Sequence, residues 1–231
     1  MVSPVNGDVV SSTGALSSEH WQELEFLTGG LCYRCGYPME QFCPPETWCG
    51  PCNANEPNIK RTRSALIYSD MSRRLILNFK HGGRVDNLTI FTNWMQSAAN
   101  EILCQPAVLV PVPLHLFRRL HRKFNQSALL SGALAKACKL QHKPQWLVRH
   151  RNTQRQGFKS TKNRQENVKG AFRVPDKYLE QIKGKRIILI DDVRTSGATL
   201  EACAKTLLLA GASQIDAITL ARIVKTQETS K

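Results

Sequence analysis

Two adjacent carboxylates, Asp191 and Asp192, lie within the stretch I-I-L-I-D-D-V-R-T-S-G-A-T, residues 187–199. Four aliphatic residues precede them, so the pair is predicted to stand at the end of a buried strand. Like charges at such a position repel each other and resist removal from water. In a chain whose net charge is +14, this pair indicates a ligand that needs both carboxylates.

The polar loop after the pair is typical of an anion site. A strand, a loop and a helix follow one another, and open α/β sheets bind ligands at the carboxyl ends of their strands. Backbone N–H groups at the start of the helix would face a phosphate, which Gly197 allows to approach closely. Asp191 and Asp192 would then meet the hydroxyls of the attached sugar and a bridging Mg²⁺. The residues expected around the phosphate are Thr195, Ser196, Gly197, Ala198 and Thr199.

A simpler interpretation of the same stretch is an acidic strand end followed by an ordinary helix, with Ser196 or Thr199 as its N-cap. That interpretation accounts for the hydroxyl groups of the loop. It leaves two neighbouring acids at the edge of the core without an explanation.

The cysteines near the start of the chain form a second constellation. Two CxxC pairs, separated by 13 residues, are made by Cys32, Cys35, Cys49 and Cys52. Each pair suits a tight turn, and four thiolates complete the tetrahedral shell of a structural zinc ion. Metal binding would supply the folding energy that so short a module lacks. A redox pair or unliganded thiols are the alternative, and Cys43 could replace one of the ligands.

The length, composition and net charge of the chain limit the class of protein to which it can belong. With 231 residues and 42% hydrophobic content, the chain can form one sizeable domain and a small module. Lys and Arg number 32 against 18 Asp and Glu, which indicates nucleic acid or a phosphorylated small molecule as partner, or simply a basic surface. No secretory leader pattern opens the sequence, and no apolar run approaches the ~18 residues of a membrane span. A cytoplasmic location with reduced cysteines is therefore expected.

Alternating strand and helix patterns predict an α/β protein with a mostly parallel sheet flanked by helices. Strands are expected at 65–68, 107–113, 186–190 and 215–221, and helices at 21–27, 71–80, 88–103, 125–140 and 199–210. The remaining cysteines, Cys104, Cys138 and Cys203, are assigned to helices as small core residues. The predicted organisation is a tail with a short helix (1–30), a zinc module (31–56), a linker over 53–63 and the main domain (64–224).

The acidic stretch resembles the signature with which type I phosphoribosyltransferases bind phosphoribosyl pyrophosphate (PRPP). Further motifs follow the order seen in the ComF/GntX family, competence-associated proteins that join a zinc finger to a phosphoribosyltransferase domain. These motifs are the CxxC pairs, L-I-L-N-F-K-H-G-G, V-P-V-P-L-H, F-N-Q-S, N-R-Q-E-N-V-K-G-A-F and D-D-V-R-T-S-G-A-T. The resemblance covers about residues 30–223, and its specificity comes from their ordered combination.

The resemblance implies a role for each motif. Asp191 and Asp192 would hold the ribose hydroxyls of PRPP, with Mg²⁺, and residues 195–199 would hold its 5′-phosphate. The loop that begins with Pro111 and Val112 would meet the pyrophosphate.

Two further segments that take part in the resemblance contain basic and amide side chains. Arg119, Arg122, Asn125 and Gln126 look like the family's R-x-R-G-F-N-Q element, in which Lys123 here replaces the glycine. The family's long loop, expected to act as a lid, is matched by Thr153, Gln156, Arg164 and Asn167. Its basic residues would close over the pyrophosphate, with Arg164 as a catalytic residue, although a solvated charged loop has the same composition.

Several functions remain open at this point. The first is PRPP-dependent transfer to an acceptor that the sequence does not name. Arg194 and Thr195 stand where purine-salvage members of the fold carry an acidic base, so a purine acceptor is not expected. The second is a single-stranded DNA-binding adaptor of natural transformation, alongside other competence-machinery proteins, in which aromatic residues next to basic ones stack on bases: Tyr33, Phe117, Phe124 and Phe158. A regulator that senses PRPP is the third.

Overall fold

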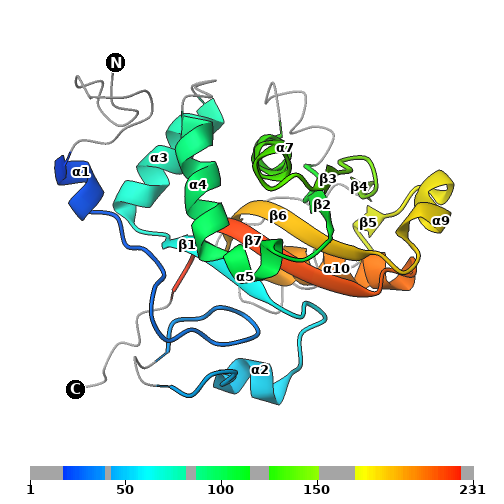
Figure 1. The fold of residues 1–231 in the computed structure, drawn as a ribbon, viewed down its shortest axis with the longest axis horizontal. Helices are drawn as coiled ribbons and strands as arrows, with labels where there is room; N and C mark the ends of the chain where they lie inside the picture. Colours follow the sequence, from blue (N-terminus) through cyan, green and yellow to red (C-terminus); the bar gives the residue numbers. More distant parts are fainter. Residues whose placement is uncertain (1–17, 40–42, 82–86, 115–124, 151–169, 225–231) are drawn as a thin grey trace.

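The computed structural model describes residues 18–39, 43–81, 87–114, 125–150 and 170–224 (Figure 1). Its centre is a five-stranded sheet in the order β1-β7-β6-β2-β3, in which all neighbouring strands are parallel. These strands are β1 (Thr62–Ile67), β2 (Val108–Pro111), β3 (Gln141–His142), β6 (Arg186–Arg194) and β7 (Gln214–Arg222). The predicted parallel α/β architecture is confirmed.

Helices cover both faces of this sheet. In the view of Figure 1, α3 (Asp70–His81), α4 (Leu88–Ala98) and α7 (Gln126–Cys138) lie above it, and α10 (Ala198–Leu209) lies below. Successive side chains of a strand point to opposite faces, so β6 contributes Ile188 and Ile190 to the upper core and Ile187 and Leu189 to the lower one. A strand buried on both faces is aliphatic throughout, which explains the run I-I-L-I.

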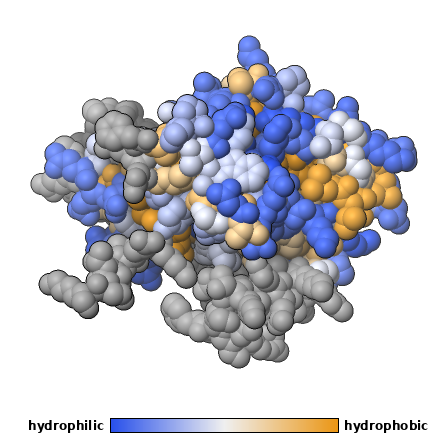
Figure 2. All heavy atoms as spheres, turned by 90° about the horizontal axis from the view of Figure 1, so that it is seen from below, coloured by the Kyte–Doolittle hydropathy of each residue, from blue (hydrophilic) through white to orange (hydrophobic). Residues whose placement is uncertain are grey.

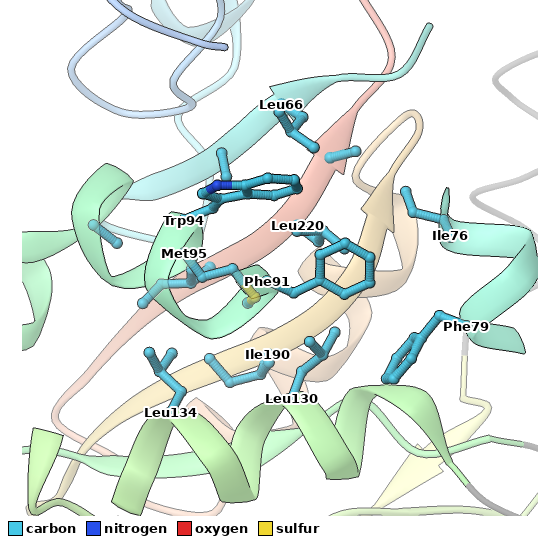
Figure 3. Packing of buried hydrophobic residues seen from close by; sticks show 14 of the residues in the cluster. Leu66, Ile76, Phe79, Phe91, Trp94, Met95, Leu130, Leu134, Ile190 and Leu220 are labelled. Atoms are coloured by element: carbon cyan, nitrogen blue, oxygen red, sulfur yellow. The ribbon is translucent and has the colours of Figure 1, made fainter. Parts of the chain in front are cut away.

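The upper core is built mainly from aromatic and branched side chains (Figure 3). Phe91 and Met95 of α4 lie over β6 and β7, opposite Leu130 and Leu134 of α7. Phe79 of α3 meets Phe91 edge to face, with ring centroids 5.5 Å apart. This packing fixes α7 against β6, and the start of α7 reaches the candidate site described below.

Two predicted helices differ from the structure. The expected helix at 21–27 is instead α1 (Ser18–Gln22), because the chain that follows pairs with the outer edge of β1. Leu27 donates its N–H to Ala65 at 3.0 Å, and Ile67 donates to Glu25 at 2.8 Å, so this segment covers an otherwise open edge strand. The expected helix at 88–103 is interrupted at the fully buried Ala99 and continues as α5 (Asn100–Leu103).

The predicted linker over 53–63 is packed structure. It begins within α2 (Gly50–Ala54) and ends within β1, and the Ile59 side chain is only 3% exposed in the lower core. Asn58 donates through its backbone N–H to Glu201 of α10 at 3.0 Å, and the backbone N–H of Arg61 donates to the buried Asp216 of β7 at 3.1 Å. The small module is therefore followed at once by chain that belongs to the core of the main domain.

The remaining elements are short. They are β4 (Val148–Arg149) and β5 (Phe172–Arg173), which pair antiparallel, the 3₁₀ helix η2 (Asp176–Tyr178) and α9 (Leu179–Ile182). Elements of this length show no periodicity, so the sequence did not predict them.

The described surface is largely hydrophilic when seen from below, and apolar side chains gather toward the end where α9 and α10 lie (Figure 2). The large hydrophobic side chains exposed among the described residues are Trp21, Leu209 and Ile223. Within the described ranges, no helix has both the length and the apolar character needed to cross a membrane.

Candidate functional site

The chain changes direction across the sheet between β2 and β6. From β2 it passes through α7 above the sheet to β3, whereas from β6 it passes through α10 below the sheet to β7. β2 and β6 are neighbours, with Pro111 paired to Ile190 at the end of β2. Such a switch point opens a crevice at the carboxyl ends of the two strands, which is where parallel sheets bind ligands.

The acidic pair lies at this switch point, where β6 continues past the end of β2. β6 extends four residues beyond the predicted strand 186–190, so Asp191 and Asp192 belong to the strand itself and are half-buried. β2 has already ended at Pro111, and among the described strands β6 is paired from Asp191 onward with β7 alone. Within the part of the chain that the structure describes, the carboxylates therefore belong to a stretch of β6 that has a paired strand on one side.

The start of α7 holds Asp191 in place. Ser127 Oγ donates to Asp191 Oδ1 at 2.9 Å, and the backbone N–H of Asp192 donates to the same oxygen at 2.9 Å. Asn125 is the N-cap of α7: its Oδ1 accepts from the Ser127 N–H at 3.1 Å, and its Nδ2 donates to the Val112 carbonyl at 3.2 Å. Ser127 was not predicted as a site residue, although it completes the F-N-Q-S motif.

The loop after β6 is short and ends on a glycine. Thr195 and Ser196 are exposed, and Gly197 is the N-cap of α10 with φ of 82°. Gly197 has no side chain with which to cap α10, and Ser196 Oγ accepts from the Ala198 N–H at 3.5 Å. The interpretation as a helix start with a hydroxyl acceptor therefore keeps some support from Ser196, while the first N–H groups of the twelve-residue α10 still need acceptors beyond the helix itself.

The end of β2 and the loop after it contribute shape, since neither Pro111, the last residue of the strand, nor Val112 offers a free backbone donor. Proline has no N–H, and Val112 donates its N–H to the Ile190 carbonyl at 2.9 Å. Both Pro111 and Val112 are buried. The other predicted binding or lid residues, Arg119, Arg122, Lys123, Thr153, Gln156, Arg164 and Asn167, lie outside the described residues, and so do Phe117, Phe124 and Phe158.

Arg194 connects this loop to the cysteine-rich segment. Its Nη1 donates to the Cys35 carbonyl at 2.6 Å, and Arg222 Nη1 donates to the same oxygen at 2.8 Å. The Arg194 guanidinium also lies directly over Gly197, where a Cβ atom would be 3.0 Å from Nε and 3.1 Å from Nη2. Gly197 thus has two reasons to be glycine, its positive φ and this close approach.

The four predicted metal ligands come together. The Sγ atoms of Cys32, Cys35, Cys49 and Cys52 all lie within 4.8 Å of one another. Cys32 Sγ accepts from the backbone N–H of Cys49 at 3.2 Å and of Cys35 at 3.5 Å. A compact set of four sulfur donors with N–H···S contacts fits zinc, which four thiolates bind in a closed tetrahedral shell. Cys43 is half-buried and is not part of the cluster.

The thiols of the cluster differ in acidity. Burial of the Cys35 thiol raises its pKa. The positive charge of Arg194 is the largest of several effects that lower it, and together they bring the pKa of Cys35 down to about 6. Burial raises the pKa of Cys49 to about 11 and also raises the pKa of Cys52. One ligand is therefore already a thiolate near neutral pH, while at least two must lose a proton when a metal binds.

The other cysteines have separate environments. Cys203 is fully buried in α10, and burial raises its pKa well above the usual value. Cys138 is half-buried, and burial raises its pKa too. The prediction that Cys104 is a core residue is wrong, because it follows the end of α5 and is exposed.

Arginine side chains stack on the aromatic rings of the cysteine-rich segment. Arg61 lies over Tyr33 and Arg34 lies over Trp48, each 4.4 Å from the ring centroid. The sequence placed Tyr33 next to Arg34, but the partner of its ring is Arg61, from the start of the main domain. Both contacts are cation–π interactions: the one between Arg61 and Tyr33 joins the two parts of the chain, and the one between Arg34 and Trp48 lies within the cysteine-rich segment.

Comparisons with known proteins agree with this architecture. The model of the phosphoribosyl transferase domain matches residues 127–230. The DNA utilization protein YhgH of Escherichia coli (strain K12) is 29% identical over 212 residues, which cover 83% of this chain and 84% of that protein. Competence protein ComFC of Bacillus subtilis (strain 168) is 30% identical over 208 residues, which cover 87% of this chain and 81% of that protein.

Similarity to solved structures is more distant. The glutamine PRPP amidotransferase of B. subtilis matches with a TM-score of 0.39 and 20% identity over 58% of this chain and 27% of that one. The sequence relatives are more informative, because their identity extends over most of both chains. With a phosphoribosyltransferase domain that spans α7, β6 and α10, and with this extent of identity to ComFC, the chain belongs to the ComF family.

Proposed function

We propose that this protein binds PRPP together with Mg²⁺ in the crevice between β2 and β6. The observation that carries the proposal is the position of the half-buried pair Asp191 and Asp192 just before the start of α10, where the N-cap is Gly197. One feature suits vicinal hydroxyls and a divalent cation, and the other suits a phosphate. Both lie at the switch point of a phosphoribosyltransferase domain.

In this proposal each element holds one part of PRPP. Asp191 and Asp192 bind the ribose hydroxyls and Mg²⁺, and residues 195–199 bind the 5′-phosphate. The loop that starts at Pro111 and Val112 shapes the pyrophosphate subsite, where Arg119 and Arg122 supply positive charge. Arg164, in the long basic loop, closes over the leaving pyrophosphate.

The reaction that such a site supports is phosphoribosyl transfer. The bond between C1′ and the pyrophosphate oxygen breaks, the electron pair leaves with the pyrophosphate, and an acceptor bonds to C1′. Cations on the leaving group and exclusion of water favour this step. Arg194, which stands where a base toward a purine would be expected, is engaged with the Cys35 carbonyl, so we do not propose a purine acceptor.

We propose that the protein takes part in DNA uptake and that it is located in the cytoplasm. Relatives of the chain are named for competence and for DNA utilization. Four of the eight cysteines form the proposed zinc site, and thiols used as metal ligands suit a reducing compartment.

Calorimetry of PRPP binding tests the proposal. We expect micromolar binding that requires Mg²⁺ and disappears in the double variant Asp191→Asn, Asp192→Asn, since both changes remove carboxylate ligands while keeping the side-chain volume. Asp176→Asn is the control, because it removes the same charge from an exposed position in η2. If the unmodified protein gives no heat with PRPP and Mg²⁺, the proposed function is wrong.

A second candidate, a single-stranded DNA-binding adaptor, is favoured by the basic aromatic surface of the cysteine-rich segment. Tyr33 and Trp48 each keep one ring face against an arginine and are only partly buried. We expect an oligonucleotide to bind with an affinity that falls steeply as salt rises, because phosphate contacts release counterions. Fluorescence anisotropy of a labelled strand measures this, and Trp48→Ala should weaken binding through loss of base stacking. An affinity that does not change with salt would exclude the adaptor.

A further inference from the structure

Arg194 belongs to two parts of the molecule at once. It is the last residue of β6, so its backbone leads directly into the loop at 195–197. Its guanidinium lies against Gly197, the residue that opens α10, and donates to the carbonyl of Cys35 at 2.6 Å. A single planar group thus contacts the start of the anion-binding helix and the turn that carries a metal ligand.

The turn that Arg194 contacts is held from several sides. Gly36 has φ of 65°, and a Cβ atom on it would lie 2.5 Å from the Thr62 carbonyl, so the turn is pressed against β1. The Thr62 N–H donates to the Arg34 carbonyl at 2.7 Å, and Arg63 Nη1 donates to the Tyr33 carbonyl at 3.1 Å. A metal bound to Cys35 Sγ would fix the same residue from its other end.

Docking of the cysteine-rich segment does not require Arg194. Arg222 donates to the same carbonyl at 2.8 Å, and the contacts of Thr62 and Arg63 hold the neighbouring residues. Arg194 differs from these groups because it alone among them also packs on Gly197. Removal of its guanidinium should therefore leave the segment docked and affect mainly the loop.

We infer that Arg194 is a positioning residue that makes the shape of the anion-binding loop depend on the zinc-bound cysteine cluster. The path runs from the cluster through the Cys35 carbonyl and the guanidinium to Gly197 and the first N–H groups of α10. Zinc in this chain would then support phosphate binding at the opposite end of that path as well as folding its own segment. The ligand class, a sugar 5′-phosphate, rests on the proposed function, whereas the mechanical link does not.

Hydrogen exchange of the full, zinc-loaded chain without ligand tests the link. Arg194→Gln should make the amides of 195–199 exchange several-fold faster while zinc content and the melting temperature stay close to those of the unmodified chain. Arg194→Lys, which keeps a donor for the Cys35 carbonyl, should recover most of this protection. Equal exchange in the unmodified chain and in Arg194→Gln would overturn the inference.

Gly36→Ala tests the same path from the side of the cluster. It must shift the turn away from Thr62 and leaves the loop at 195–199 itself unchanged. Because Gly36 follows Cys35 and donates its N–H to the Cys32 carbonyl at 2.8 Å, the zinc content of this variant is measured first. We expect faster exchange at 195–199 in the otherwise unmodified chain and no further increase when Arg194→Gln is already present, because coupled changes are not additive. Gly29→Ala is the control, with φ of 85° and no atom within 4 Å of the added Cβ. Additive effects of the two changes would contradict the link.

Should Gly36→Ala fail to retain zinc, chelation of zinc replaces it in the same comparison. Chelation should accelerate exchange at 195–199 in the unmodified chain more than it does in Arg194→Gln. An equal increase in both would overturn the inference.

PRPP calorimetry on the same variants separates the proposed function from the proposed role of Arg194. If the unmodified chain binds PRPP, Arg194→Gln should weaken binding about tenfold. If it does not bind, the proposed function fails, while the exchange data still decide the role of Arg194.

Discussion

Gly197 opens α10 with φ of 82°, and the guanidinium of Arg194 occupies the space that a side chain there would need. Asp191, another residue of the candidate site, accepts a hydrogen bond from the hydroxyl of Ser127 at 2.9 Å. At the scale of single residues, the candidate site therefore depends on side chains that fix the shape of the backbone or orient a carboxylate. These supporting groups matter because a binding site needs its ligands held in place before the ligand arrives.

Gly197→Ala is expected to reduce the free energy of unfolding by about 1–2 kcal/mol through its positive φ and to weaken PRPP binding at least about tenfold through displacement of Arg194. Denaturant unfolding and calorimetry measure the two effects. Gly184→Ala is the matched control, because its φ is 68° but no atom lies within 4 Å of the added Cβ. It should lose similar stability and bind PRPP normally. Unchanged PRPP binding in Gly197→Ala would show that the loop does not need this close approach.

At the scale of elements, non-periodic segments hold the sheet and α10 together, and the start of a helix orients the acidic pair. Residues 25–27 cover the edge of β1, and the chain from Asn58 to Arg61 is tied to α10 and β7. The start of α7 supplies the hydroxyl that holds Asp191. Asp191 is therefore oriented by a contact between a helix and a strand, while the non-periodic segments stabilise the sheet that carries it.

Ile59→Ala tests whether this connection is part of the core. The side chain is 3% exposed, so we expect a loss of about 2–5 kcal/mol in the free energy of unfolding, from lost burial and the cavity that remains. Asn55→Ala, at an exposed position of the same segment, should change stability by less than about 0.5 kcal/mol. Urea unfolding of both variants makes the comparison. Equal stabilities would restore the interpretation of this segment as a loose linker.

At the scale of the whole molecule, the cysteine-rich segment and the main domain share one set of contacts. Two arginines from β6 and β7 donate to Cys35, and an arginine before β1 stacks on Tyr33. Because these contacts join the cluster to three strands of the sheet, binding of a metal to the cluster should stabilise the whole chain.

Zinc should raise the melting temperature, and the rise should grow from pH 6 to pH 8. Cys49, whose pKa burial raises to about 11, is protonated throughout this range, so zinc must displace its proton. Each displaced proton makes zinc binding about tenfold tighter per pH unit, until the pH reaches the raised pKa. Cys35, with a pKa of about 6, is already deprotonated over most of the range and contributes to this dependence only near pH 6.

Thermal melts with zinc or with a chelator, at several pH values, measure this dependence. Cys49→Ser should remove most of the zinc effect, whereas Cys43→Ser should leave it unchanged, because Cys43 is outside the cluster. A zinc effect that does not vary with pH would contradict the assignment of protonated thiols.

Some features of this protein were determined by the sequence alone. The aliphatic run before Asp191 predicts a strand buried on both faces, and alternation with helices predicts the parallel sheet, because these patterns repeat over many residues. The spacing of the two CxxC pairs likewise identified the four cysteines that the structure brings together. The sequence was sufficient to predict these features, since each strand, helix or CxxC pair is recognised from residues that lie close together in the chain.

Only the tertiary structure decided how the acidic loop is supported. Ser127 is 64 residues from Asp191 in the sequence, and Cys35 is 159 residues from Arg194. Such pairs have no periodicity or spacing to reveal them, because the sheet order brings them together. The acidic pair and its loop were predicted from their own residues, but the groups that hold them could be found only where α7, β6 and the cysteine cluster meet.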